Sequence, residues 1–178
     1  MNIANMITVA RLLCVPAVLY CLLHGEMRLA FYIFLFAGFS DAVDGIIARR
    51  FNQRTELGAW LDPIADKLLM VSVFVMLAWL DIIPDWIVFL AVTRDALIVG
   101  GVMMSTLIGD PIKVAPLMLS KANTAVQILL IVVALSDQAF GLDLAGAVTI
   151  LLYLAALLTL ASGASYLVVW MRHVAGSK

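Results

Sequence analysis

The chain has few charged residues for its length. Only 13% of its 178 residues are Asp, Glu, Lys or Arg, whereas 65% are hydrophobic. A soluble domain is typically about a quarter charged and about half apolar, so this composition argues against an ordinary soluble protein. The formal net charge is −1, and without a basic excess we expect no nucleic-acid partner. The composition predicts an all-α integral membrane protein.

Cysteine and histidine are also scarce, with two residues of each. Cys14 and Cys21 are seven positions apart on one predicted helix. This arrangement does not make a natural disulfide, and no zinc-ligand spacing is present. We expect both thiols to be small packing residues. The N-terminus lacks the basic segment and small-residue cleavage site of a signal peptide, so we expect none.

The chain is rich instead in long apolar runs. A helix needs about 20 apolar residues to cross the hydrocarbon core of a bilayer, and six stretches reach this length. Short polar segments separate them, so residues 1–178 are expected to form a single membrane domain. The six transmembrane helices are predicted over residues 5–24, 29–50, 59–80, 84–108, 116–136 and 145–171.

Basic residues gather on one side of this predicted topology. Six spans place both termini on the same side, and the loops on the other side carry Arg28 as their one basic residue. Because basic residues are enriched on the cytoplasmic side of membranes, both termini are expected to be cytoplasmic. The basic residues on that side are Arg49, Arg50, Arg54, Lys113, Lys121, Arg172 and Lys178.

Four aspartates lie in or beside the apolar runs. An ionised carboxylate at the middle of a membrane helix costs roughly 2.5–3.5 kcal/mol, and a position near the cytoplasmic boundary lowers that cost. Asp41 and Asp44 are three positions apart near the end of the second span. Asp62 and Asp66 are four apart at the start of the third, so each pair shares a helix face. Two such pairs on adjacent helices can converge on one or two hard cations, such as Mg²⁺, Mn²⁺ or Ca²⁺.

The aspartates alone leave several functions open. They could form a structural cation site, an ion or proton path in a transporter, or a two-metal site for phosphoryl transfer, and spacing does not separate the last two. Gly45 and Ala48 would let a flat ligand approach the helix closely, although helix–helix packing favours small residues equally. A purely structural membrane scaffold would leave the cost of the aspartates unexplained.

Eight residues around the aspartates form one spaced motif. The motif reads Asp41-x-x-Asp44-Gly45-x-x-Ala48-Arg49, eight further residues, then Gly58-x-x-x-Asp62-x-x-x-Asp66. It resembles the signature of the CDP-alcohol phosphatidyltransferase family. The start of the chain, NIANMITVAR, is similar to the family's N-terminal segment. The stretches TRDALIVGG (93–101) and SKANTAVQ (120–127) are most similar to its cardiolipin synthases of the mitochondrial type, which also occur in some bacteria.

This resemblance implies transfer of a phosphatidyl group from CDP-diacylglycerol to an alcohol, with release of CMP. It implies two divalent cations, Mg²⁺ or Mn²⁺, held by the four aspartates, with Asp66 as general base. It also implies a homodimer, which we expect in a bacterial inner membrane with its active site facing the cytoplasm. The residues expected to bind the nucleotide are Gly45, Ala48, Arg49 and Gly58.

The expected acceptor is phosphatidylglycerol, which would give cardiolipin. Glycerol 3-phosphate is the alternative within the family, and the segment between spans 4 and 5 is shorter here than in the mitochondrial enzymes, which bears on this choice. A cation-coupled transporter is the alternative outside the family. Polar residues in the other spans are candidates for contact with substrate or acceptor. These candidates are Asn5, Thr8, Arg11, Arg94, Lys113 and Lys121.

Each of these candidates also has a structural interpretation. Arg11 could extend to the membrane surface, and Lys113 could simply follow the positive-inside topology. Arg94 should turn inward, towards either an acidic partner or an acceptor phosphate. A polar stripe on the fifth span could bind substrate or form hydrogen bonds between helices with equal ease. The stripe consists of Ser120, Asn123, Thr124 and Gln127.

Overall fold

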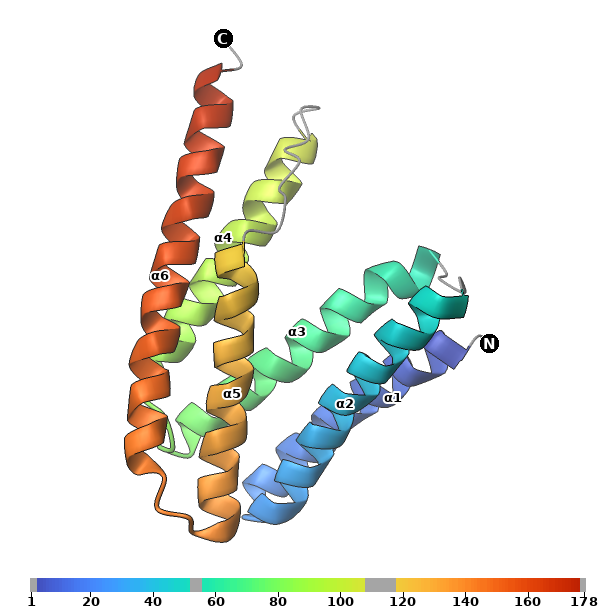
Figure 1. Ribbon diagram of the computed structural model, residues 1–178, viewed down its shortest axis with the longest axis vertical. Helices are drawn as coiled ribbons and strands as arrows, with labels where there is room; N and C mark the ends of the chain where they lie inside the picture. Colours follow the sequence, from blue (N-terminus) through green and yellow to red (C-terminus); the bar gives the residue numbers. More distant parts are fainter. Residues whose placement is uncertain (1–2, 52–55, 108–117, 177–178) are drawn as a thin grey trace. The chain divides into compact units, whose positions relative to one another are not determined.

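The computed structural model describes residues 3–51, 56–107 and 118–176, with side chains over 10–40, 65, 67–101, 103 and 118–171. This part of the chain is built from α-helices and contains no strand. The helices therefore confirm the predicted all-α class. They are α1 (Ile3–Leu23), α2 (Met27–Phe51), α3 (Glu56–Trp79), α4 (Asp85–Leu107), α5 (Met118–Phe140) and α6 (Ala145–Gly176) (Figure 1).

The helix ends agree with the predicted spans within a few residues, and the largest differences are at the ends of α5 and α6. The predicted end of the fifth span at residue 136 is wrong, because Asp137 stays helical and the chain turns only at Gly141. Gly141 has a φ of 62°, which glycine adopts without strain. Its N–H donates to the Asp137 carbonyl at 2.8 Å. The Asp137 carboxylate in turn accepts a hydrogen bond from the Leu144 N–H at 2.8 Å, which closes the turn before α6.

Two helices, α5 and α6, are long and apolar enough to cross a membrane. The described parts of α1, α2 and α3 contain shorter apolar stretches, Ala10–Leu23, Met27–Ser40 and Lys67–Trp79. The described helices also expose many large apolar side chains, as expected where lipid covers the surface. The chain is therefore membrane-associated, whereas six spans and cytoplasmic termini stay predictions.

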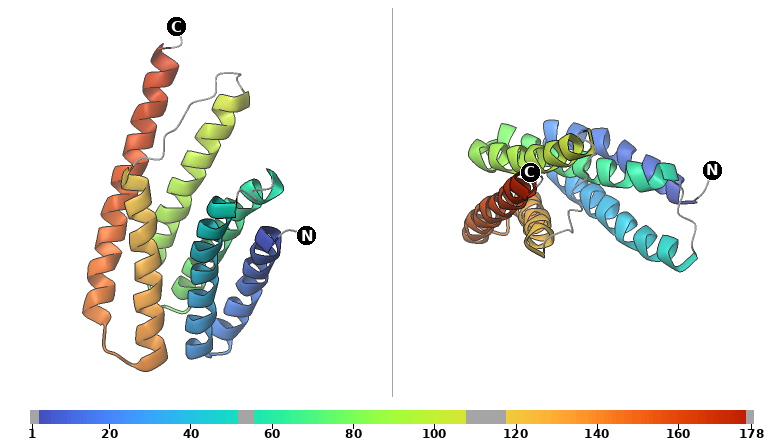
Figure 2. Two further views of the ribbon diagram at one scale, coloured as in Figure 1. Left: turned by 45° about the vertical axis from the view of Figure 1, so that its right-hand side comes forward. Right: turned by 90° about the horizontal axis from the view of Figure 1, so that it is seen from above.

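The helices form two compact units. Unit 1 comprises Met1–Ile83 and Ile131–Leu144, and unit 2 comprises Pro84–Leu130 and Ala145–Lys178. In unit 1, α1 packs against both α2 and α3 (Figure 1 and Figure 2). The core of this unit is apolar and includes the fully buried Val18, Leu22, Ala30, Val73 and Leu77.

The end of α5 is fastened to α2 within unit 1. The Arg28 guanidinium donates through Nε to the Ala139 carbonyl at 2.9 Å, a favourable position for a cation because the C-terminal end of a helix is electronegative. Phe140 packs edge-on against Phe31 with ring centroids 5.4 Å apart. Arg28, which the sequence assigns to the outer loops, therefore also connects α2 to the end of α5.

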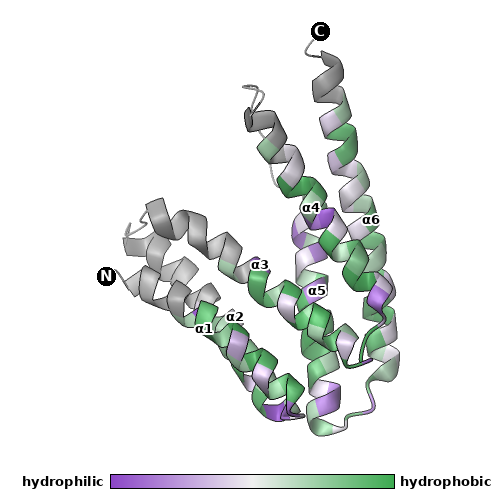
Figure 3. Cartoon of the chain, turned by 180° about the vertical axis from the view of Figure 1, so that it is seen from behind, coloured by the Kyte–Doolittle hydropathy of each residue, from purple (hydrophilic) through white to green (hydrophobic). Residues whose placement is uncertain are grey.

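In unit 2, α4 packs against α6. Among the described side chains, the interior of this unit contains several polar ones, whereas that of unit 1 contains Arg11. Figure 3 shows hydrophilic positions on α4 and α5 among mostly apolar residues. Among the side chains that the structure describes, the buried polar ones of unit 2 are Arg94, Asn123, Gln127, Thr159 and Ser162. These side chains need partners inside the unit, because a buried polar group without a hydrogen bond is costly.

Candidate functional site

The aspartate motif lies in the C-terminal half of α2 and the N-terminal half of α3 in unit 1. α2 is helical through Asp41 and Asp44, and α3 through Asp62 and Asp66. This confirms that each pair is spaced on a helix, so the two positions of a pair fall on one helix face. The link from Phe51 to Glu56 contains five Cα–Cα steps of about 3.8 Å, which keeps these helix ends within about 19 Å of each other.

The side chains of the motif lie outside the described ones, as do those of Asn5 and Thr8, and Lys113 lies outside the described residues altogether. Among the described side chains there is no group of three His, Cys, Asp or Glu residues that could hold a metal. The roles of these residues therefore stay predictions. The motif residues concerned are Asp41, Asp44, Gly45, Ala48, Arg49, Gly58, Asp62 and Asp66.

Arg11 is buried within unit 1. Arg11 is only 3% exposed. It belongs to α1, which contacts both of the helices that carry the motif, α2 and α3. A guanidinium that extends to the membrane surface would keep its charged end in water. The burial of Arg11 therefore favours an interior role, such as contact with bound substrate or with a neighbouring acidic group.

Arg94 forms the centre of the polar cluster in unit 2. It is 5% exposed, which agrees with the prediction that it turns inward. Its Nη1 lies 2.8 Å from Asp95 Oδ1 in an ion pair. Its Nη2 donates to Ser120 Oγ at 2.7 Å and to Ser162 Oγ at 2.5 Å. One guanidinium therefore joins α4 to both α5 and α6.

These contacts favour the structural interpretation of Arg94. Recognition of a phosphate by arginine commonly uses two parallel N–H donors. Here both terminal nitrogens already have protein partners, and within the described residues only Nε lacks an acceptor. The Tyr166 ring covers the guanidinium, with its centroid 5.8 Å from Cζ. An acceptor phosphate would have to displace at least one of these contacts.

The polar stripe on α5 forms hydrogen bonds with α6. Thr159 Oγ1 donates to Asn123 Oδ1 at 2.8 Å and accepts from Gln127 Nε2 at 3.4 Å. All three side chains are buried, so the contacts support the interhelical interpretation of this stripe. Lys121, by contrast, is exposed and stands outside the buried cluster, where it could meet a lipid headgroup or an acceptor.

The α6 partners of this cluster were not identified from the sequence. Thr159, Ser162 and Tyr166 lie in a long and mostly apolar helix, where a few hydroxyl residues do not by themselves indicate a cluster. Their spacing at three and seven positions was the available signal, because residues with these separations share one helix face.

The fold and the sequence together describe an α-helical membrane protein with an acidic sequence motif on two consecutive helices. Comparison with known families identifies it further. The model of the CDP-alcohol phosphatidyltransferase family matches residues 1–172. The chain therefore belongs to this family, which confirms the resemblance seen in the motif.

Individual relatives are similar over almost the whole chain. The probable cardiolipin synthase (CMP-forming) of Drosophila melanogaster is 34% identical over 97% of this chain and 58% of its own length. The human cardiolipin synthase (CMP-forming) is 31% identical over 93% of this chain and 60% of its own length. The chloroplastic CDP-diacylglycerol–glycerol-3-phosphate 3-phosphatidyltransferase 1 of rice is 31% identical over 93% and 56%. The chain thus spans less than two thirds of the length of these relatives.

Proposed function

We propose that this protein transfers the phosphatidyl group of CDP-diacylglycerol to phosphatidylglycerol, giving cardiolipin and CMP. The observation that carries the proposal is the complete aspartate motif on α2 and α3 of a family member. The similarity of the chain to fly and human proteins named cardiolipin synthase supports the choice of acceptor.

The chemistry requires a hydroxyl oxygen to attack a phosphorus atom whose diphosphate is already negative. The new P–O bond forms to the acceptor, the bond to CMP breaks, and the hydroxyl proton goes to the Asp66 carboxylate. Four carboxylates make an all-oxygen donor set, which fits hard divalent cations such as Mg²⁺ or Mn²⁺. Asp41, Asp44, Asp62 and Asp66 would hold these cations. When bound, they would neutralise the diphosphate and favour in-line attack.

The remaining motif residues would bind the nucleotide. Gly45 and Ala48 follow Asp44 on α2, where their small size would admit the cytidine ring close to the helix, and Arg49 would pair with a phosphate. Gly58 precedes the second aspartate pair on α3. The proposed contacts for the acceptor come from Asn5, Thr8, Arg11, Lys113 and Lys121, while Arg94 is assigned chiefly to positioning the helices of unit 2.

A second acceptor, glycerol 3-phosphate, has its own support. The rice relative that is 31% identical over 93% of this chain is named for that acceptor. Both acceptors carry a phosphate group, so basic residues do not distinguish them. A cation-coupled transporter stays the alternative outside the family, and it predicts no dependence on CDP-lipid.

The assembly and the membrane of this protein are also proposals. A homodimer rests on family membership. Relatives occur in eukaryotes and in mycobacteria. We propose that this protein lies in a bacterial inner membrane with its active site facing the cytoplasm.

The decisive experiment supplies the purified protein with CDP-diacylglycerol and each acceptor separately, with Mg²⁺, with Mn²⁺ or with EDTA. We expect metal-dependent release of CMP with phosphatidylglycerol and a cardiolipin product seen by mass spectrometry. Release of CMP with glycerol 3-phosphate but not with phosphatidylglycerol would reject the cardiolipin assignment. No release with any alcohol would reject the enzymatic proposal.

A further inference from the structure

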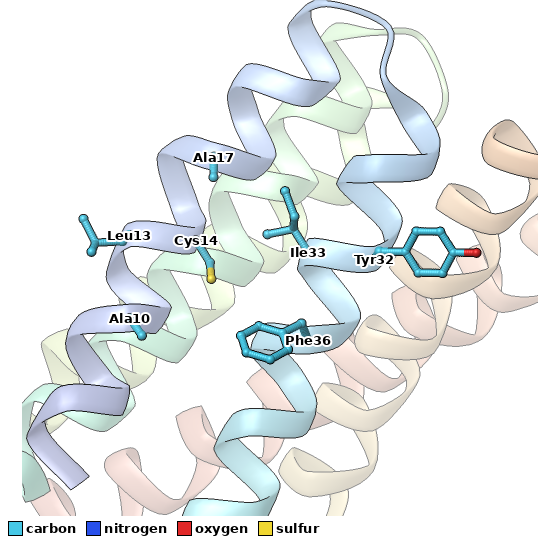
Figure 4. A pocket seen from close by; sticks show the side chains of 7 residues that line it. All are labelled: Ala10, Leu13, Cys14, Ala17, Tyr32, Ile33 and Phe36. Carbon is cyan, nitrogen blue, oxygen red and sulfur yellow. The ribbon is translucent and has the colours of Figure 1, made fainter. Parts of the chain in front are cut away.

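An apolar groove of about 490 Å³ lies between α1 and α2 in unit 1. Its two walls differ in side-chain size (Figure 4). The α1 wall carries Leu13 and three small residues at positions four and three apart, and the α2 wall carries only larger ones. The six residues that matter here are Ala10, Cys14 and Ala17 on α1, and Tyr32, Ile33 and Phe36 on α2.

The groove follows from the local sequence. Two helices packed along a stripe of small residues would normally approach closely, but the large α2 side chains opposite hold the walls apart. Pro16 lies within the same stretch of α1, and its lack of an N–H leaves the Leu12 carbonyl without its helical hydrogen bond. Phe36 is 65% exposed, so the groove opens outwards from the unit.

We propose that this groove holds one acyl chain of the CDP-diacylglycerol substrate, a step that rests on the proposed function. The lining is almost wholly hydrocarbon, and Figure 4 shows the Tyr32 hydroxyl pointing away from α1. The groove thus offers nothing to a polar headgroup. Ile33 precedes Asp44 by eleven residues on α2, which is about 16.5 Å along the helix axis and about three full turns, so the two positions lie on nearly the same face of α2. An acyl chain lying along this face would run towards the motif proposed to hold the diphosphate.

The size of the groove favours an acyl chain over a second copy of the protein. Small-molecule sites typically occupy about 300–1,000 Å³, and this groove lies within that range. A stable protein interface takes about 20–30 residues from each partner, far more than line the groove. A lipid tail gains little from leaving one apolar environment for another. The benefit is therefore orientation, because a fixed chain limits the positions that the attached diphosphate can take.

Filling the groove tests the proposal. Ala17→Leu and Cys14→Leu should raise the KM for CDP-dioleoylglycerol about tenfold or more, because even one methylene group too many in an apolar site costs about tenfold and each substitution adds more bulk than that. The kcat should change little, and CDP-dihexanoylglycerol should be used as well as by the unsubstituted protein. The matched control is Ala125→Leu at an exposed position of α5, which should leave both substrates unaffected. Phe36→Ala enlarges the groove and should shift preference towards the bulkier CDP-diphytanoylglycerol.

A second measurement reports occupancy without turnover. In a Cys21→Ala background, CDP-dioleoylglycerol added with Mg²⁺ but without an acceptor alcohol should slow alkylation of Cys14 more than CDP-dihexanoylglycerol does. Equal alkylation rates, together with an unchanged KM in the filling variants, would overturn the groove assignment while metal-dependent CMP release still upheld the proposed function. If the filling variants lost activity equally with the long-chain and short-chain substrates and also changed oligomeric state, the groove would belong to an interface with a second copy. This result would also overturn the acyl-chain proposal. Absence of CMP release from the unsubstituted protein would reject the function itself.

Discussion

Replacing Arg94 with methionine should destabilise unit 2 in a way that depends on Asp95. The substitution keeps the length of the side chain but removes the ion pair at 2.8 Å and the donors to Ser120 and Ser162. Breaking a buried ion pair at one partner costs about 3–5 kcal/mol. We take the lower end, about 3 kcal/mol, because the Asp95 side chain is still 19% exposed.

A second substitution separates the charge from the hydrogen bonds. In Arg94→Met with Asp95→Asn, the charge that Arg94 pairs with is removed together with Arg94, so the loss of unfolding free energy should fall to about that of the two serine contacts. Hydrogen bonds between membrane helices average about 0.6 kcal/mol each, which gives about 1 kcal/mol for the pair. For a chain of this size each kcal/mol shifts Tm by about 2–4 °C. The single variant should therefore melt about 6–12 °C lower and the double variant about 2–4 °C lower.

The measurement is thermal unfolding of the purified protein in one detergent, followed by tryptophan fluorescence. Activity with phosphatidylglycerol is measured below both melting temperatures. Equal Tm values for the single and double variants would refute the coupling between Arg94 and Asp95. An unchanged Tm with a raised KM for the acceptor would instead return Arg94 to the acceptor site. Arg94→Lys retains the charge but not the forked geometry, and should fall between the wild type and Arg94→Met.

Two further predictions concern the motif and the α5–α6 turn. Asp66→Asn should abolish CMP release while retaining binding of CDP-diacylglycerol, measured by equilibrium binding in detergent, and full activity in this variant would remove Asp66 as the base. Gly141→Ala should lower stability by about 1–2 kcal/mol, because an alanine at a φ of 62° is strained. Its Tm should fall by about 2–8 °C with kcat unchanged at lower temperature, whereas an unaltered Tm would show that the turn relaxes without cost.

The sequence predicts the helices well because apolar runs of membrane length leave few alternatives. Their ends are set by local interactions that hydrophobicity does not report. The polarity of Asp137 is typical of a loop residue, but its carboxylate accepts a hydrogen bond from the Leu144 N–H after the turn, and the positive φ values fall later, on Gly141 and Asp143. The helix therefore continues for another turn.

Contacts between helices are harder to predict than the helices themselves. The sequence indicates that Arg94 turns inward, but not that its acidic partner is the adjacent Asp95, because neighbouring positions on a helix diverge by about 100° and only the long arginine side chain closes that gap. The α1–α2 groove depends on which small residues face which large ones. That pairing requires the packing register of the two helices, which a hydropathy pattern does not contain.

The need for a defined register also explains why unit 2 keeps a buried arginine. An ion pair in the interior is often no more stabilising than apolar residues of the same volume, so stability alone does not account for Arg94. Apolar helices in lipid have little hydrophobic preference for one axial position over another. Arg94 contacts α5 and α6 through separate serines, and a shift of either helix by one turn, about 5.4 Å, would break its contact. We infer that the cluster selects one alignment of three apolar helices, the kind of fixed frame that an acceptor pocket requires.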